Sequence, residues 1–170
     1  CDHAEGGRPS SYFVWGSPSA DADAERAARC ANCGRAYRVS ISRGFVESLV
    51  TLEYNSVSSL EWIERHSDEI AGVFCEAVQN RSPHIVPRAF LQKLRALTAA
   101  RGVVLVFDEV VTGFRIGAGG VQEQLGIQAD LVCYGKALGG GWPVGALGGR
   151  AEVMAGVDGG VWQYGDESRP

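Results

Sequence analysis

Two continuous apolar runs, each followed by an acidic residue, constrain the fold of this chain most strongly. They are Ile70–Cys75, followed by Glu76, and 103–107, followed by Asp108. Strands that are apolar at every position occur almost only in parallel sheets whose two faces are covered by helices. The segment 87–101 between the runs carries apolar residues at helical spacing. The sequence therefore predicts an α/β fold in three layers, built on a mostly parallel sheet with right-handed crossovers.

The same periodicities predict further elements between residues 44 and 170. A helix is expected from Ser58, whose spacing to Glu61 is that of a capping box, to about residue 69. Gly102 is expected to end the helix that begins near Pro87. The remaining expected elements are a short helix over 121–126 and strands over 48–54, Leu131–Tyr134 and 144–147.

Residues 1–43 show neither a helical nor a strand period, and Pro9 and Pro18 interrupt them. We predict no readable fold there and assign 44–170 to one partial domain. The chain starts with Cys1 instead of Met and ends at Pro170 with no closing element. It is therefore expected to be a fragment of a longer protein.

Charge and composition exclude several classes of protein. A net charge of −4 argues against a nucleic-acid binder, and no apolar run approaches the roughly 20 residues of a membrane helix. The first residues lack the blocks of a signal peptide, so a cytoplasmic location is expected. The odd count of five cysteines predicts reduced thiols. Cys30 and Cys33 have the spacing of a metal pair, but no further ligands stand nearby, so we predict no metal site.

Polar residues follow three predicted strands and suggest a site, because ligands of open parallel sheets bind beyond the carboxyl ends of the strands. They are Glu76, Asp108 and Lys136. Any one of them alone would be read as a loop residue in water. Of the two lysines, Lys93 falls on an amphipathic helix, whereas Lys136 follows a buried strand directly. A partly desolvated amine there would have a lowered pKa and act as nucleophile or base.

An aspartate that reaches a heteroaromatic nitrogen and a lysine that binds an aldehyde form the pair that pyridoxal phosphate (PLP) requires. A phosphate-binding P-loop is disfavoured, because Gly135-Lys136 is followed by Ala137 and not by Ser or Thr. A dinucleotide-binding fold is disfavoured too, since no Gly-x-Gly-x-x-Gly follows the first predicted strand.

The chain from about residue 45 to 170 resembles the class III aminotransferases of PLP fold type I. The resemblance is carried by 106–115 (VFDEVVTGFR), 130–141 (DLVCYGKALGGG) and 143–146 (PVGA). These segments are most similar to glutamate-1-semialdehyde aminomutases. Residues 76–81 and 159–170 resemble the aminotransferase domains of polyketide and nonribosomal peptide synthases.

The resemblance implies the cofactor PLP and a set of residues that bind it. Asp108 would pair with the pyridine nitrogen, Val110 would pack on the ring face, and Lys136 would bind the cofactor covalently. Glu76 falls near the cofactor, although Ala77 replaces the proline that usually follows. Arg81 takes the place of an asparagine that reaches the phenolic oxygen. Separately, Val111 replaces the glutamine of ornithine-type relatives, which argues against that branch.

The implied activity is the transfer of an amino group from an amino acid donor to a carbonyl acceptor. In the synthase branch the acceptor is a β-ketoacyl chain on a carrier protein. The alternatives are an aminomutase, which moves the amino group within one molecule, and a non-catalytic α/β module with Lys136 as an ordinary loop lysine. The resemblance also implies a homodimer whose phosphate grip and small domain lie outside this sequence, so the fragment is expected to be inactive alone.

Overall fold

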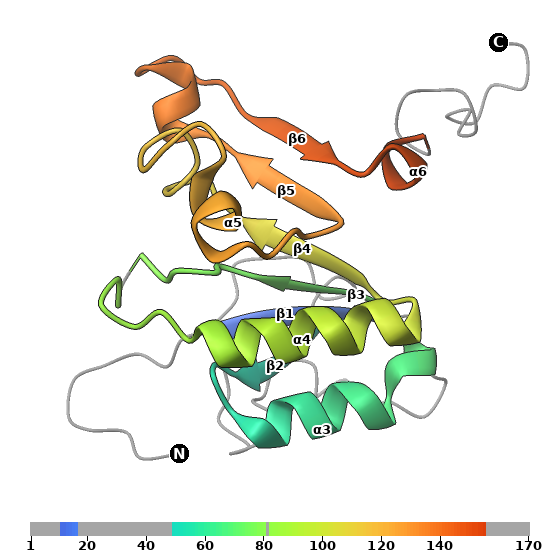
Figure 1. The fold of residues 1–170 in the computed structure, drawn as a ribbon. Coiled ribbons are helices and arrows are strands. Elements are labelled where there is room, and N and C mark those ends of the chain that lie inside the picture. Colours follow the sequence, from blue (N-terminus) through green and yellow to red (C-terminus); the bar gives the residue numbers. More distant parts are fainter. Residues whose placement is uncertain (1–10, 17–48, 81, 156–170) are drawn as a thin grey trace, which may run out of the picture.

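The computed structural model describes residues 11–16, 49–80 and 82–155, which form a six-stranded sheet flanked by helices (Figure 1). The strand order is β2-β1-β3-β4-β5-β6. The strands are β1 (Ser11–Gly16), β2 (Leu49–Glu53), β3 (Ile70–Cys75), β4 (Val104–Asp108), β5 (Leu131–Tyr134) and β6 (Ala146–Gly149).

Strand directions confirm a mostly parallel sheet. β3, β4 and β5 pair in parallel, and β1 pairs antiparallel with both β2 and β3, so β2 to β5 all share one direction. β6 runs antiparallel to β5. Two strands differ from the expectation by more than one residue. β1 lies within residues 1–43, where no element was predicted, and β6 begins two residues later than the predicted 144.

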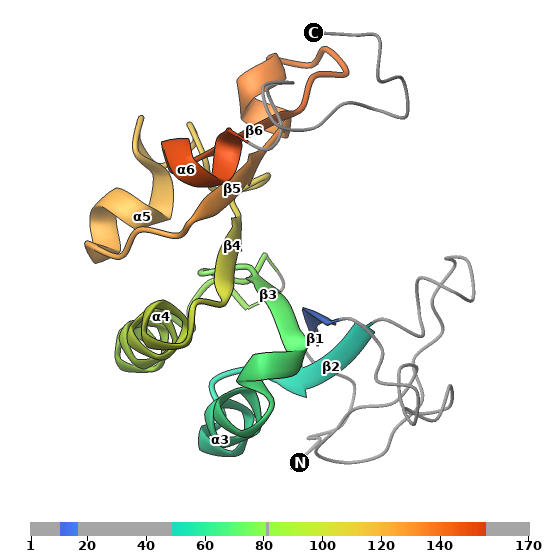
Figure 2. The same cartoon turned by 90° about the vertical axis from the view of Figure 1, so that its right-hand side faces the viewer.

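Three of the described helices lie on one side of the sheet (Figure 2). They are α3 (Val57–Arg65), α4 (Arg88–Arg101) and α5 (Gly120–Leu125). The predicted three-layer fold has a helical layer on each face of the sheet. In the described part of the chain, these three helices form one of those two layers. Short elements complete this part of the chain, namely the 3-10 helices η1 (Ser67–Glu69) and η2 (Lys136–Gly139) and the helix α6 (Ala151–Met154).

The core lies between the sheet and the helices. Leu105 and Phe107 of β4 are fully buried against this layer, together with Leu91 and Leu94 of α4. The alternate positions face the other side of the sheet, where Phe74, Val106 and Leu131 stand in register on three neighbouring strands and are half-buried. The strands are thus apolar on both faces, as the sequence indicates.

The end of α4 agrees with the sequence-based prediction, whereas the start of α3 differs from it. Gly102 ends α4 in the left-handed conformation with φ 68°, as predicted. The start of α3 is different, because Ser56 and not Ser58 is the residue before the helix, and its side chain makes no capping bond. Asn55 turns the chain with φ 59°, so the helix begins earlier than the predicted capping box. The two serine hydroxyls bond each other at 2.8 Å instead.

Asp130, the residue before β5, bonds with residues of β4 and α4 and with Arg150, which lies between β6 and α6. Its Oδ2 accepts hydrogen bonds from the Leu105 N–H at 2.8 Å and from Arg95 Nη1 at 2.7 Å, and its Oδ1 accepts one from Arg150 Nη1 at 3.2 Å. Burial alone would raise the pKa of this carboxyl group. The hydrogen bond from Leu105, then Arg95 and Arg150, outweigh burial and hold the pKa below its ordinary value.

We expect Asp130→Asn to lower stability at pH 7 by about 2 kcal/mol, because charged hydrogen bonds are lost. Because the pKa is lower in the folded state than in the unfolded state, the carboxylate stabilises the fold at pH values above its ordinary pKa, near 4. This contribution is lost as the pH falls through the pKa of the folded state. The wild type should therefore lose stability below about pH 4 more steeply than the variant. Urea unfolding at pH 7 and pH 3 measures this, with Glu152→Gln, an exposed neighbour of Arg150, as control. If Asp130→Asn had the same loss of unfolding free energy at pH 7 and at pH 3, this prediction would be contradicted.

Candidate active site

The carboxyl ends of β3, β4 and β5 meet at one edge of the sheet, since these strands are parallel (Figure 1). Glu76 follows the last residue of β3, and Asp108 is the last residue of β4. Lys136 follows β5 after one intervening residue, Gly135. The structure thus places all three polar residues that the sequence singles out at the same edge. Lys93 lies elsewhere, exposed on α4.

Asp108 is half-buried and stands opposite Cys133 in the pairing of β4 with β5. Its Oδ1 accepts a hydrogen bond from the Val110 N–H at 2.9 Å, which fixes the orientation of the carboxylate. No described residue donates a hydrogen bond to its Oδ2. Burial, and then the charge of Asp108, raise the pKa of the Cys133 thiol, so this thiol stays protonated beside the carboxylate.

Val110 packs against the backbone that leads into Lys136. A Cβ placed on Gly135 would lie 3.2 Å from Cγ1 of Val110, which is tighter than ordinary van der Waals contact. Gly135 therefore lets the segment after β5 approach the segment after β4 closely. This close approach brings Val110 next to Gly135, the residue that precedes Lys136, across neighbouring strand ends.

Lys136 has an unusual backbone conformation at the start of η2. Its φ is 45°, in the left-handed region, which costs a residue with a side chain roughly 1–2 kcal/mol. Such strain is concentrated at functional sites. The side chain is exposed, and among the described residues none pairs with its amine. The partial desolvation expected for this amine is thus not provided by the described part of the chain.

Glu76 is engaged in a turn. Its Oε2 accepts a hydrogen bond from the Asn80 N–H at 2.8 Å, which closes the segment after β3. The Ala77 that follows is buried, and its carbonyl accepts a hydrogen bond from the Tyr54 hydroxyl at 2.7 Å. Burial raises the pKa of Tyr54, so this phenol remains a donor. Arg81 lies outside the described residues.

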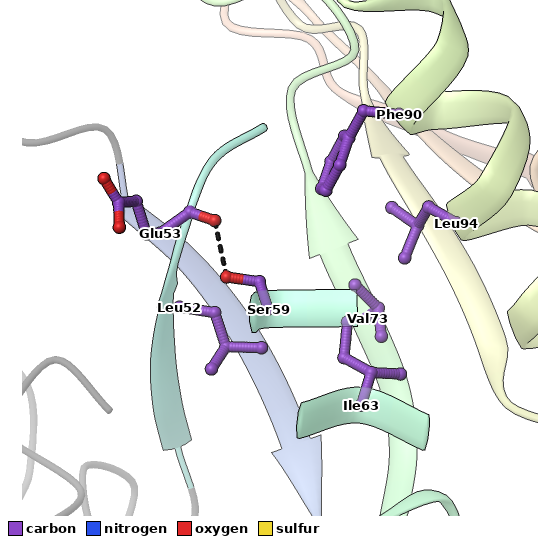
Figure 3. Close-up of a pocket in the computed structure, with 7 residues that line it drawn as sticks. All are labelled: Leu52, Glu53, Ser59, Ile63, Val73, Phe90 and Leu94. Atoms are coloured by element: carbon purple, nitrogen blue, oxygen red, sulfur yellow. Dashed lines mark hydrogen bonds between the residues drawn. The ribbon is translucent and has the colours of Figure 1, made fainter. Parts of the chain in front are cut away.

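A cavity exists on the helical side of the sheet, between α3, α4 and strands β2 and β3 (Figure 3). Its volume is about 10 Å³, which holds a single water molecule at most. Its seven lining residues are mostly apolar, and none is a predicted site residue. They are Leu52, Glu53, Ser59, Ile63, Val73, Phe90 and Leu94. This cavity is too small for an organic substrate.

One buried carboxylate at the strand ends was missed by the sequence reasoning. Glu109 follows Asp108 and is 0% exposed. The signal that could have found it is the pair Asp108-Glu109 together with Gly119-Gly120 ahead of a short helix.

The described residues contain no cluster of three or more His, Cys, Asp or Glu side chains that could hold a metal ion. Cys75 and Cys133 are free thiols. The paired Cys30 and Cys33 lie outside the described residues. None of the described helices has the length and apolar character needed to span a membrane.

Comparisons with known proteins give the same family from sequence and from structure. Glutamate-1-semialdehyde 2,1-aminomutase of Desulfotalea psychrophila is 46% identical over 129 residues, covering 74% of this chain and 30% of that protein. An omega-transaminase from Sphaerobacter thermophilus superimposes with a TM-score of 0.65 at 32% identity, covering 86% of this chain and 42% of that one. A transaminase with PLP bound also superimposes with a TM-score of 0.65 at 32% identity, covering 74% and 30% of the two chains.

The chain spans less than a third of the length of this curated relative. The family model described as class-III aminotransferase matches residues 36–163, which is more than half of the chain. The predicted resemblance, fold type and cofactor class are thereby confirmed. This chain belongs to the class-III aminotransferases, a family of PLP-dependent enzymes.

Proposed function

We propose that the parent protein, the complete polypeptide that contains these residues, transfers an amino group from an amino acid donor to a carbonyl acceptor. The observation that carries the proposal is the arrangement of Asp108 and Lys136 at the carboxyl ends of neighbouring parallel strands, joined by the contact of Val110 with Gly135. Ligands of open parallel sheets bind at this edge.

The residues at this edge fit PLP. A half-buried carboxylate is held by one hydrogen bond on Oδ1, and its Oδ2 receives none from the described residues. The lysine amine two residues after β5 likewise has no described partner. Bound PLP would supply a conjugated ring that takes up the electron pair left when a proton leaves the substrate carbon.

We assign the roles as follows. The Asp108 carboxylate would keep a proton on the pyridine nitrogen, because its negative charge stabilises the protonated ring. Lys136 would bind the cofactor through Nζ and, once displaced by substrate, would move a proton at the substrate carbon. Val110 would pack on the ring face. Glu76 would help to bind the cofactor by closing the turn after β3, as its bond to Asn80 suggests.

For the acceptor we favour a β-ketoacyl chain held on a carrier protein. This assignment is supported by the resemblance of residues 76–81 and 159–170 to synthase-embedded aminotransferase domains. An aminomutase is the second candidate, because the curated relative at 46% identity carries that name.

The transferase and the aminomutase differ in whether a separate amine donor is consumed. A donor-to-acceptor assay with the purified parent protein measures this directly. Consumption of the amino acid donor in step with formation of a β-aminoacyl product would support the transferase.

The proposed assembly is a homodimer acting in the cytoplasm. The apolar half-buried face with Phe74, Val106 and Leu131 fits a position inside a larger enzyme, since open apolar faces of this kind are usually covered. The chain length relative to the curated relative supports the same interpretation.

We expect the 170-residue chain by itself to bind PLP weakly and to show no amino transfer. The phosphate of a cofactor is usually anchored by helix N-termini and neighbouring loops, and the resemblance implies that this phosphate grip lies outside this sequence. The measurement is a PLP titration and transfer assay of this chain beside the parent protein. Full turnover by a monomeric 170-residue chain would contradict the proposal.

The general test of the proposed function is the absorbance spectrum of the parent protein before and after borohydride reduction. A visible band that disappears on reduction, with a label that stays on the protein, is the expected result. A colourless protein that takes up no PLP would overturn the proposed function.

A further inference from the structure

Glu109 is a buried carboxylate for which the proposed chemistry has no use. Its side chain is 0% exposed, and it stands between Asp108 and Val110, two of the proposed cofactor contacts. A buried carboxylate is unfavourable unless hydrogen bonds or charges replace its water. The partners that stabilise it therefore indicate what it holds in place.

Three donors bind this carboxylate. Oε2 accepts hydrogen bonds from the Val121 N–H at 2.8 Å and from the Thr112 hydroxyl at 3.1 Å. Oε1 accepts one from the Gln122 N–H at 3.1 Å. Val121 and Gln122 lie in the first turn of α5, where N–H groups have no partner within the helix and where a negative charge is favourable. The carboxylate thus fixes the segment after β4 to the start of α5.

Gly120 makes this close approach feasible. It has φ 61°, and a Cβ built on it would collide with the carboxylate of Glu109. Only glycine combines this backbone conformation with the space that the carboxylate needs.

The main chain of Glu109 is fixed as well. Its N–H donates to the carbonyl of Cys133 at 3.0 Å, which extends the pairing of β4 with β5 one residue beyond Asp108. Its carbonyl accepts a hydrogen bond from the Gly113 N–H at 2.8 Å. A Cβ on Gly113 would lie 2.6 Å from Cδ1 of Tyr134, so the turn also packs tightly on β5.

We infer that Glu109 is a positioning residue whose anchored carboxylate holds Asp108 and Val110 in place opposite Gly135 and Lys136. Successive side chains of an extended chain point to opposite faces, so burial of Glu109 on the side of α5 directs the Asp108 carboxylate to the other face. The inference rests on the proposed function, because the groups that it positions are the proposed cofactor contacts.

The test uses Glu109→Gln in the parent protein. The variant loses the charge and places an amide NH₂ where N–H donors already point. In the absence of PLP, the amides of Val110 and Gly113 should exchange with deuterium at least about tenfold faster than in the wild type. With PLP bound, the midpoint of the pH titration of its absorbance should shift from the wild-type value, and Asp108→Asn measured in parallel should shift this midpoint in the same direction.

Glu123→Gln is the matched control. The Glu123 Oε2 accepts a hydrogen bond from the Gly119 N–H at 3.2 Å next to the same helix start, but this side chain is exposed and lies away from β4 in the chain. This variant should keep the wild-type exchange at Val110 and Gly113 and the wild-type absorbance titration. If Glu123→Gln changed the exchange and the absorbance titration as much as Glu109→Gln does, Glu109 would act only as an ordinary helix cap. That result would overturn the inference.

If Glu109→Gln does not fold, Thr112→Val replaces it, since this change removes only the hydroxyl donor to Oε2. A smaller shift of both readouts in the same direction is then expected. A folded variant with wild-type exchange and a wild-type absorbance titration contradicts the inference. A wild type that takes up no PLP would overturn the proposed function instead, whereas the exchange measurement would still decide whether Glu109 holds this segment.

Discussion

Replacing Lys136 by alanine should abolish covalent cofactor binding and lower the rate of amino transfer by at least about a thousandfold. No other described lysine lies at the carboxyl edge of the sheet, since Lys93 is on α4. Removing the amine takes away both the group that binds the cofactor and the base that moves the proton. Borohydride reduction of the wild type followed by peptide mapping checks the first effect, and single-turnover kinetics check the second.

Lys93→Ala is the matched control for this experiment. Lys93 is exposed on a solvent-facing position of α4, so its loss should leave the label and the transfer rate unchanged. A pyridoxyl label found on Lys93 alone would refute the assignment of Lys136.

Asp108→Asn should leave PLP bound, at reduced affinity, and lower the transfer rate on the order of a thousandfold. A neutral amide does not hold the proton on the pyridine nitrogen, so the ring takes up electrons less well where carbanion charge develops. The amide oxygen can still accept the hydrogen bond from the Val110 N–H, so the local fold should persist. The rate of the half-reaction with a single amino acid measures this effect apart from the acceptor.

Glu76→Gln serves as the comparison for Asp108→Asn, because its carboxylate closes a turn through Asn80. The amide oxygen can keep that bond, so a much smaller loss of rate is expected. Near-wild-type turnover of Asp108→Asn in the half-reaction would remove Asp108 from the proposed mechanism.

Short apolar runs bounded by polar or turn-forming residues could be predicted well from the sequence. β3 and β5 have the predicted bounds, since each run ends where a residue that favours neither burial nor extension follows it. Gly102 also marks the end of α4 correctly. The local sequence is sufficient in these cases because the length of an apolar run, or the glycine that follows a helix, directly marks where the buried element ends.

Pairing between distant segments could not be predicted in the same way. β1 lies in a stretch without periodicity, and its position depends on partners in β2 and β3. β6 begins at Ala146 because the preceding residues form a turn, in which the Val144 N–H bonds the Trp142 carbonyl at 2.8 Å. The antiparallel direction of β6 follows from that turn and not from its composition.

The candidate site also has features that the local sequence predicts and features that depend on distant segments. The sequence places Asp108 and Lys136 at strand ends correctly, because strand ends follow from local pattern. It does not reveal that Lys136 is exposed and Glu109 buried, since burial depends on what the fold brings near. The roles of Asp108, Val110, Lys136 and Glu76 stay predictions until the variants are measured.

The position of β1 has a consequence for the order in which the sheet forms during synthesis. β1 is the first described strand to be translated, yet its neighbour β3 ends only at residue 75, and β2 and β3 are both needed to pair its two edges. Pairing over such separations is slow, because a long segment must close before any bond forms. The paired residues of β3, β4 and β5 are 25 to 32 positions apart, compared with 54 to 61 positions for β1 and β3. We therefore expect the nascent chain to expose β1 as an unpaired edge, where chaperones act, until residue 75 has left the ribosome.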